Sequence, residues 1–161
     1  MARTPRSSIA EPASGWLALD HQLCFAVYAA SLAMTKLYKP LLDPLGLTYP
    51  QYLVMLVLWE GDGITVTQLG ERLSLDSGTL TPLLKRLEAA GMLQRLRDVA
   101  DERRVLLRLS AAGRRLKARA VRVPQTVACA TGCNIDELAS LVGRLKQLRT
   151  TLNQFTPEAA A

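Results

Sequence analysis

The sequence predicts a mainly α-helical protein with one small β-wing. Between Val66 and Leu109, two short helical patterns are separated by a tight turn and followed by a basic hairpin pattern. Long, apolar, helix-like stretches come before and after this region. Of the 161 residues, 20 are Lys or Arg and 14 are Asp or Glu, and the formal net charge of +6 favours a polyanionic partner. Together these observations predict a winged helix-turn-helix unit whose N- and C-terminal flanking helices form a dimerisation domain.

A long apolar helix is expected over residues 16–45, because apolar side chains recur there at steps of three and four. Asp20 is the expected cap of this helix, and Pro40 and Pro44 are expected to bend or end it. The stretch is apolar on nearly every side, which indicates burial against more than one neighbour.

Two shorter helices are expected next. The first covers Tyr49–Glu60, with Thr48 as its cap. The other covers Val66–Leu73, where Thr65 and Gln68 have the spacing of a capping box. In such a box each side chain accepts a hydrogen bond from a backbone N–H group that the start of a helix leaves unpaired.

The fourth helix follows a turn that ends at Asp76, its expected cap, and it stops at Gly91, where a left-handed residue is needed. Its leucines face inward, and its outer face is polar and cationic. That outer face carries Ser77, Thr79, Thr81, Lys85 and Arg86. Pro82 lies inside the pattern, where the loss of a backbone hydrogen bond costs about 3 kcal/mol. The helix is therefore expected either to start later or to bend at Pro82.

A basic hairpin follows, with strands at Leu93–Arg97 and Val105–Leu109, and Ile64–Thr65 can add a third strand. Apolar and basic residues alternate along the strands, and Arg95 is one of the cations. A helix-turn-helix with a polar, cationic second helix suits a DNA major groove, and a hairpin with cations at its tip suits the minor groove beside it. The alternative is an ordinary helical pair with a solvated, charged hairpin.

Two helical segments are expected after the hairpin. Ser110 caps the first, Pro124 is expected to kink it, and Gly132 ends it. Asn134 and Glu137 form another capping box, which opens a final helix with a leucine-rich stripe. That stripe lacks partners within one chain, so we expect it to be buried against a second copy, as in a homodimer. A two-fold dimer places two recognition helices roughly 34 Å apart and predicts a palindromic operator in double-stranded DNA.

The predicted organisation is a disordered tail over residues 1–15, a helical dimerisation region over residues 16–60 and 110–155, and a winged helix-turn-helix region over residues 61–109. No apolar run reaches the roughly 18 residues that a membrane span needs, and the N-terminus lacks the apolar core of a signal peptide. We therefore expect a cytoplasmic protein without membrane contact. The sequence contains no glycine-rich phosphate loop or paired-carboxylate motif, so neither a cofactor nor enzymatic activity is expected.

Four strings in the sequence are long or unusual enough to compare with known families. They are LCFAVYAAS at Leu23–Ser31, LYKPLLDPLGLTYPQYLVMLVLWE at Leu37–Glu60, LDSGTLTPLLKRLE at Leu75–Glu88, and DER at Asp101–Arg103. In these strings, and over nearly its whole length, the chain resembles the MarR family, specifically the organic hydroperoxide resistance repressors. The resemblance implies that Arg103 enters the minor groove with support from Asp101. It also implies that Ser77, Thr79 and Arg86 contact the major groove.

The same resemblance implies a redox role for Cys24, which falls at the peroxide-reactive cysteine of that subfamily. Tyr38 and Tyr49 match the two tyrosines that hydrogen-bond to its sulfur. The chemistry is consistent, because the thiolate is the nucleophile, and phenol donors and a helix start both stabilise an anion. Apolar neighbours such as Phe25 favour an organic hydroperoxide over a polar one. The alternative is that Cys24 is a small, packed core residue.

Oxidation of a thiolate by a hydroperoxide yields a sulfenic acid, which condenses with a nearby thiol. The presence of Cys129 and Cys133 resembles the two-cysteine members of the subfamily, in which the reactive cysteine of one subunit forms a disulfide with the second cysteine of the other. The resemblance thus implies an intersubunit disulfide that releases operator DNA. Cys129 is the favoured resolving residue over Cys133, and inert packing is the alternative for either.

Three other functions remain open from the sequence. A thiol peroxidase would use the same Cys24 chemistry, but no general acid–base set accompanies that cysteine. A MarR-type regulator could instead be released by a small, non-oxidising ligand bound at the dimer junction, with the cysteines incidental. Zinc binding by the cysteines is disfavoured, because the Cys129-x3-Cys133 spacing lacks the tight pairs of structural sites, so no metal is expected.

Overall fold

The computed structural model describes residues 15–101 and 103–155, so the tail predicted over residues 1–15 lies almost wholly outside the described residues. The α-helices are α1 (Leu23–Leu42), α2 (Tyr49–Glu60), α3 (Val66–Leu73), α4 (Ser77–Ala89), α5 (Ala111–Ala120), α6 (Arg122–Thr131) and α7 (Ile135–Gln154). The strands are β1 (Ile64–Thr65), β2 (Leu93–Arg97) and β3 (Val105–Leu109), and they form an antiparallel sheet in the order β1-β3-β2. The predicted class, a winged helix-turn-helix between flanking helices, is confirmed.

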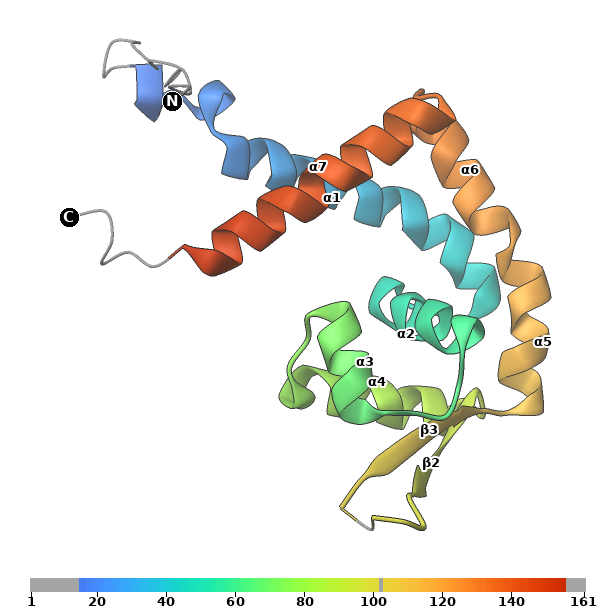
Figure 1. Cartoon of the computed structure of the whole chain (residues 1–161). Coiled ribbons are helices and arrows are strands. Elements are labelled where there is room, and N and C mark those ends of the chain that lie inside the picture. Colours follow the sequence, from blue (N-terminus) through green and yellow to red (C-terminus); the bar gives the residue numbers. More distant parts are fainter. Residues whose placement is uncertain (1–14, 102, 156–161) are drawn as a thin grey trace.

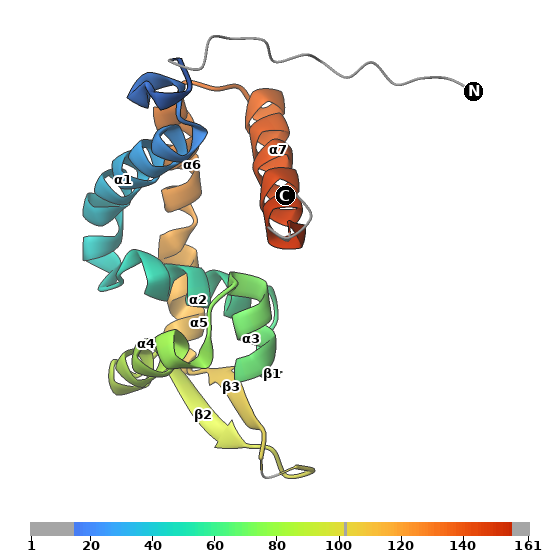
Figure 2. The same ribbon diagram turned by 90° about the vertical axis from the view of Figure 1, so that its left-hand side faces the viewer.

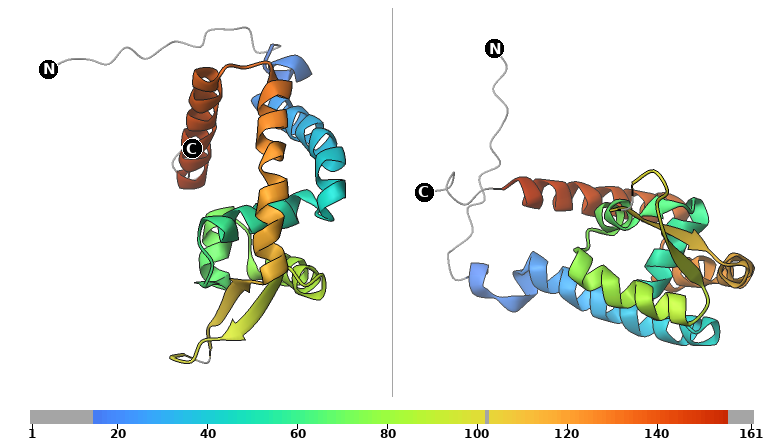
Figure 3. Two further views of the ribbon diagram at one scale, coloured as in Figure 1. Left: turned by 90° about the vertical axis from the view of Figure 1, so that its right-hand side faces the viewer. Right: turned by 90° about the horizontal axis from the view of Figure 1, so that it is seen from below.

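The elements are arranged around α2, which lies at the centre of the molecule (Figure 1). The helices α3 and α4 and the β2–β3 wing lie on one side of it, and α1, α6 and α7 extend on the other. Figure 2 shows that α7 stands apart from α1 and α6, and both views in Figure 3 agree. The protein therefore has a packed end that contains the winged helix-turn-helix and a more open helical end.

The first helix is shorter than the sequence predicted. It begins at Leu23 rather than at residue 16, and two 3-10 turns, Gly15–Leu17 and Leu19–His21, precede it. The N-cap is Gln22, so the prediction that Asp20 caps the helix was wrong. Pro40 lies inside the helix, in its last turn. The helix ends two residues later, so the backbone hydrogen bond that Pro40 cannot donate affects only this final turn.

The core is built on α2. Tyr52, Val54, Met55 and Leu58 are at most 2% exposed, and α2 contacts α1, α3, α4, α5 and β3. No single helix among the described residues is long and apolar enough to span a membrane. By length and composition alone, the stretch Leu23–Leu45 passes together with α2, as a pair bent by 67°. Because α2 is buried against its own protein, its apolar sequence is explained by the core.

Four of the predicted helix caps are confirmed by hydrogen bonds over three residues. The side-chain oxygens of the capping residues accept from the backbone N–H groups of Gln68 (to Thr65, 3.1 Å), Thr79 (to Asp76, 2.8 Å), Gly113 (to Ser110, 3.0 Å) and Glu137 (to Asn134, 2.9 Å). At the end of α4, Gly91 takes a left-handed conformation with φ of 71°. These local bonds define where the helices begin and end.

Two prolines behave differently from one another. Pro82 lies within α4, which runs without a break from Ser77, so the helix does not start later. Next to Pro82, the Thr81 hydroxyl donates a hydrogen bond to the Ser77 carbonyl at 2.7 Å and so stabilises this turn of the helix. Pro124, in contrast, accompanies a real interruption, although the break falls at Val121, between α5 and α6. A proline removes the bond to the carbonyl four residues earlier, so the disruption appears one turn before it.

A polar junction fixes α5 on the winged unit. Gly113 of α5 lies so close to the backbone of Met92 that a Cβ atom would stand 2.1 Å from the Met92 carbonyl oxygen. The Trp59 indole N–H donates to the Gly113 carbonyl at 2.9 Å, and the Arg114 guanidinium donates to the Asp62 carboxylate at 3.0 Å. Because bonds from α2 and from the loop after it converge on one turn of α5, this helix is fixed to the winged unit.

Substitution of Gly113 by Ala is expected to lower the free energy of unfolding by about 2 kcal/mol, because the added methyl group displaces α5 from the Met92 carbonyl. Denaturant unfolding followed by circular dichroism measures the change. Gly61→Ala is the matched control, since a Cβ at Gly61 meets nothing within 4 Å and its φ of −173° suits any residue. Equal unfolding midpoints for the two variants would contradict the packing argument.

Candidate DNA-binding surface and thiol site

The recognition helix α4 is clearly two-sided. Leu80, Leu84 and Leu87 are at most 1% exposed and anchor it to the core. The residues predicted to contact DNA lie on the opposite, exposed face: Ser77, Thr79, Thr81, Lys85 and Arg86. Thr79 also takes part in the helix cap, where its hydroxyl donates to Asp76 at 2.9 Å. Hydrogen bonds from the Thr79 N–H and hydroxyl lower the pKa of the Asp76 carboxyl. The cap therefore stays charged and keeps the start of α4 in place.

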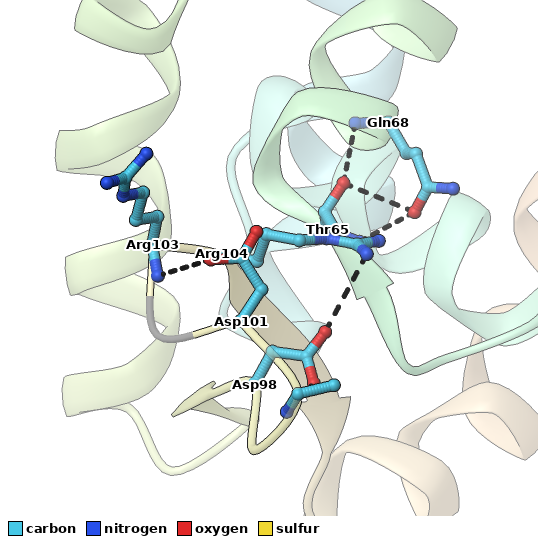
Figure 4. Close-up of polar contacts among 7 residues, drawn as sticks. Thr65, Gln68, Asp98, Asp101, Arg103 and Arg104 are labelled. Carbon is cyan, nitrogen blue, oxygen red and sulfur yellow. Dashed lines mark hydrogen bonds and ion pairs between the residues drawn. The ribbon is translucent and has the colours of Figure 1, made fainter.

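The wing tip is ordered by two aspartates (Figure 4). Asp101 accepts a hydrogen bond from the backbone N–H of Arg103 at 3.0 Å, and Asp98 lies 3.8 Å from the Arg104 guanidinium. The side chain of Arg103 extends away from Asp101. Asp101 thus fixes the backbone at Arg103, while its carboxylate does not bind the Arg103 guanidinium.

A cleft of about 510 Å³ separates the recognition helix from the wing. Its lining combines hydroxyls from β1, α3 and α4 with guanidinium groups from β2 and the wing tip. The lining residues are Thr65, Val66, Thr67, Thr81, Leu84, Arg95, Arg103, Arg104 and Val105. Three arginines line this one cleft, so a polyanion would be attracted to the space between the helix and the wing.

Arg95 differs from the other predicted contact residues, because another side chain holds it. Its guanidinium Nε donates to Glu88 Oε2 at 2.7 Å, and its backbone N–H donates to Glu88 Oε1 at 3.0 Å. The Arg95 guanidinium, followed by the Arg95 N–H, lowers the pKa of the Glu88 carboxyl. The sequence did not reveal this pair, since the two residues belong to different elements.

Cys24 is exposed and is the second residue of α1, because the helix begins later than the sequence predicted. Phe25 and Tyr28 are exposed beside it. The exposure of Cys24 argues against the alternative that it is a packed core residue of the single chain.

The two tyrosines predicted to serve Cys24 form a separate aromatic cluster. The ring centroids of Tyr38 and Tyr49 are 4.6 Å apart, and those of Tyr38 and Tyr52 are 5.9 Å apart. Burial, and then the neighbouring Tyr49 and Tyr52, raise the pKa of Tyr38 to about 12. Tyr38 therefore keeps its proton at neutral pH and can donate a hydrogen bond. Tyr52 was not predicted, although its spacing of three from Tyr49 places both on one face of α2.

One chain does not bring the cysteine and the tyrosines together. Cys24 and Tyr38 lie on the same helix, fourteen residues apart. At the helical rise of about 1.5 Å per residue, roughly 21 Å separates them along the axis. The tyrosine cluster thus lies at the far end of α1 from the thiol, and any contact between them requires a second copy of the chain.

The other cysteines lie at the end of α6. Cys129 is exposed on the helix, and Cys133 is half-buried just beyond it. The Cys133 thiol donates to the Thr131 carbonyl at 3.7 Å, and all three cysteines are free. Among residues 15–101 and 103–155, no group of three His, Cys, Asp or Glu side chains could hold a metal ion.

Comparison with known proteins agrees with this geometry. A profile of the SarA/Rot transcriptional regulators matches residues 36–120. The regulator TtmR of Methylorubrum extorquens is 53% identical over 84% of this chain and 69% of its own length. The organic hydroperoxide resistance transcriptional regulator of Bacillus subtilis is 50% identical over 84% of this chain and 92% of its own.

Solved structures show the same architecture. AbfR of Staphylococcus epidermidis superposes with a TM-score of 0.73 at 33% identity, covering 88% of this chain and 98% of AbfR. AbfR has also been solved reduced and bound to DNA, with a TM-score of 0.71, and in a disulfide form, with a TM-score of 0.59. The protein is therefore a DNA-binding transcriptional regulator, and the chain belongs to the MarR family of winged-helix regulators. Within that family it belongs with the organic hydroperoxide resistance regulators, as the resemblance of its sequence motifs predicted.

The raised pKa of Tyr38 predicts a specific loss of stability in alkali. The unfolded chain releases this proton near pH 10 and the folded chain near pH 12, so the contribution is complete below pH 10 and is lost as pH rises to 12. Urea unfolding at stepwise pH between 9 and 12 is expected to show a smaller decline for Tyr38→Phe than for the wild type. An identical decline in both proteins would rule this origin out.

Proposed function

We propose that this protein is a homodimeric repressor that releases a palindromic operator when an organic hydroperoxide oxidises Cys24. The observation that carries the proposal is the separation of Cys24 along α1 from Tyr38, which lies beside Tyr49 of α2. A thiol at one end of the helix and its hydrogen-bond donors at the other form one site only when two copies meet. Oxidation of that site is then coupled to the arrangement of the subunits.

The homodimer is supported by the unpaired apolar faces of the helical end. On α7, Leu141, Val142, Leu145 and Leu152 are 44–63% exposed, and none of its residues is buried. On α1, Leu32 and other large apolar side chains are likewise exposed. A soluble chain rarely leaves such a surface uncovered, and a second copy offers the same apolar faces in return.

DNA binding is assigned to the exposed face of α4 and to the wing tip. In a two-fold dimer, Ser77, Thr79, Thr81, Lys85 and Arg86 of each subunit would face successive major grooves roughly 34 Å apart. Arg103 would enter the minor groove, with Asp101 fixing its backbone. The guanidinium of Arg95 is bound by Glu88, so Arg95 is not among these direct contacts.

The sensing step is a two-electron oxidation of sulfur. The Cys24 thiolate attacks the terminal oxygen of the hydroperoxide, an S–O bond forms and the O–O bond breaks. The alkoxide that leaves takes up the proton that the Cys24 thiol gave up on ionising, so the products are a sulfenic acid and an alcohol. The thiol of Cys129 of the partner subunit then attacks the sulfenic acid, so that an S–S bond forms and water leaves. Hydrogen bonds from Tyr38 and Tyr49 of the partner subunit would stabilise the thiolate before attack.

The disulfide would act on DNA binding through α6 and α5. Cys129 lies on α6, and α5 is fixed to the winged unit through Gly113 and Trp59. A disulfide that pulls α6 toward α1 of the partner would therefore move α5 and, with α5, the recognition helix. Two recognition helices that no longer match consecutive grooves would lose the operator.

The thiol chemistry can be tested on a non-reducing denaturing gel. One equivalent of cumene hydroperoxide is expected to give a dimer-sized band that a reductant reverses. The band is expected to be absent in Cys24→Ser and Cys129→Ser and retained in the matched control Cys133→Ser. No band, with Cys24 unmodified by mass, would exclude the redox proposal. A band lost only in Cys133→Ser would move the resolving role to that residue.

The wing contact can be tested with Arg103→Ala. If Arg103 reads the minor groove, affinity for a duplex selected from a random pool by the wild-type protein is expected to fall roughly tenfold or more. Arg108→Ala is the control, because Arg108 is exposed on β3 away from the tip. Fluorescence anisotropy at fixed salt measures both. Equal, small losses would indicate general charge rather than a specific contact.

A second candidate function is release by a small, non-oxidising ligand. A cleft of about 520 Å³ lies between α2 and the α5–α6 segment, and its lining includes Tyr52, Trp59, Lys117 and Val121. The cleft is mainly apolar and also carries one cation, Lys117, and one carboxylate, Glu60, so it suits a small aromatic compound. Release of DNA from Cys24→Ser by salicylate, without any oxidant, would favour this function over the redox one.

A further inference from the structure

Glu88 joins the end of the recognition helix to the middle of the wing. It is the next-to-last residue of α4, and its two carboxylate oxygens both bind Arg95 of β2. Oε1 accepts from the Arg95 backbone N–H at 3.0 Å, while Oε2 accepts from Nε at 2.7 Å and lies 2.7 Å from Nη2. Both side chains are about one-third exposed, so the pair is partly shielded from water.

The sheet explains why the Arg95 backbone needs a partner outside it. β2 is an edge strand in the order β1-β3-β2, and Arg95 lies opposite Leu107. Leu107 turns its carbonyl toward the other neighbour, where it accepts from the Gly63 N–H at 2.7 Å. Arg95 and Leu107 are therefore a non-hydrogen-bonded pair, and the Arg95 N–H points out of the sheet. Glu88 supplies the acceptor that no strand provides.

An acidic residue at this position is unfavourable on local grounds. The last turn of a helix carries partial negative charge, which disfavours Glu88 and favours a cation. A carboxylate near the cleft between α4 and the wing also repels DNA phosphates. Both costs are offset if Glu88 fixes the wing on the recognition helix, since that attachment serves the complex with DNA as a whole.

We propose that Glu88 and Arg95 are positioning residues for DNA binding, whose ion pair sets the angle between the recognition helix and the wing. The pair keeps Arg103 aimed at the minor groove while α4 occupies the major groove. Arg95 then supports affinity through Glu88 and not by contacting a phosphate. This inference rests on the proposed mode of DNA binding. It adds the ion pair that holds the recognition helix and the wing at a fixed angle to each other.

The sign of the effect of Glu88→Ala tests the proposal. The probe is a duplex selected from a random pool by the wild-type protein, beside a shuffled duplex of equal length. Affinity for the selected duplex is expected to fall roughly tenfold, although a negative charge has been removed. Affinity for the shuffled duplex is expected to be unchanged or higher. Unchanged or tighter binding to the selected duplex would overturn the proposal.

Matched variants separate positioning from charge. Glu71→Ala removes an exposed acid from the neighbouring helix α3 and is expected to leave binding unchanged or tighter. Glu88→Gln keeps an acceptor for the Arg95 N–H and is expected to lose less affinity than Glu88→Ala. If Glu88→Ala does not fold, as judged by thermal melting, Glu88→Gln carries the test, and tighter binding by that variant would overturn the proposal.

A double-mutant comparison assigns the role of Arg95. Arg95→Ala is expected to weaken binding by about the same factor as Glu88→Ala. The double variant is expected to bind no more weakly than either single variant, because both changes remove the same ion pair. Losses that multiply in the double variant would mean that Arg95 contacts DNA independently. If the wild-type protein selects no duplex at all, the proposed function fails. If it selects one and all Glu88 and Arg95 variants bind it normally, only the positioning role fails.

Discussion

Burial of α2 is the constraint on which the rest of the structure depends. Tyr52, Met55 and Leu58 are enclosed because α1, α3, α4, α5 and β3 all pack on this one helix. A helix that is apolar on every side cannot be stable at a surface, so its neighbours must surround it. The consequence is mechanical. The recognition helix and the start of the helical end share one close-packed core, and a displacement of one is resisted or transmitted by the other.

The thiol site follows from the same arrangement. α1 crosses the helical end as one continuous helix, with Cys24 in its first turn and Tyr38 in the part that packs near α2. The helix is rigid, so the distance between thiol and phenol cannot close within a chain. The proposed sensor would therefore be incomplete as a monomer, and its chemistry would depend on the same partner that determines the spacing of the recognition helices. In that proposal, geometry links sensing to DNA binding before any disulfide forms.

Three features of the structure are unfavourable for the helix that contains them. Pro82 lies inside the recognition helix, Glu88 puts negative charge at the end of that helix, and α7 leaves its leucines in water. Each feature destabilises an isolated element. Each also lies at a surface that the proposed function assigns to DNA or to the partner subunit, where contacts in the complex would offset the destabilisation. The core around α2 shows no such exception among the described residues, since no buried side-chain nitrogen or oxygen there lacks a partner.

The sequence by itself determined the elements whose signals are local. The caps at Thr65, Asp76 and Asn134 act through hydrogen bonds over three residues, so α3 and α7 were predicted with their starts, whereas Pro82 left the start of α4 open. The separation of Cys24 from Tyr38 was implicit in the predicted helix. Only the tertiary structure decided where α1 begins, where α5 and α6 divide, and that Arg95 is bound by Glu88. Those features depend on contacts between elements, and a pattern that repeats every three or four residues carries no information about which distant surface a side chain will meet.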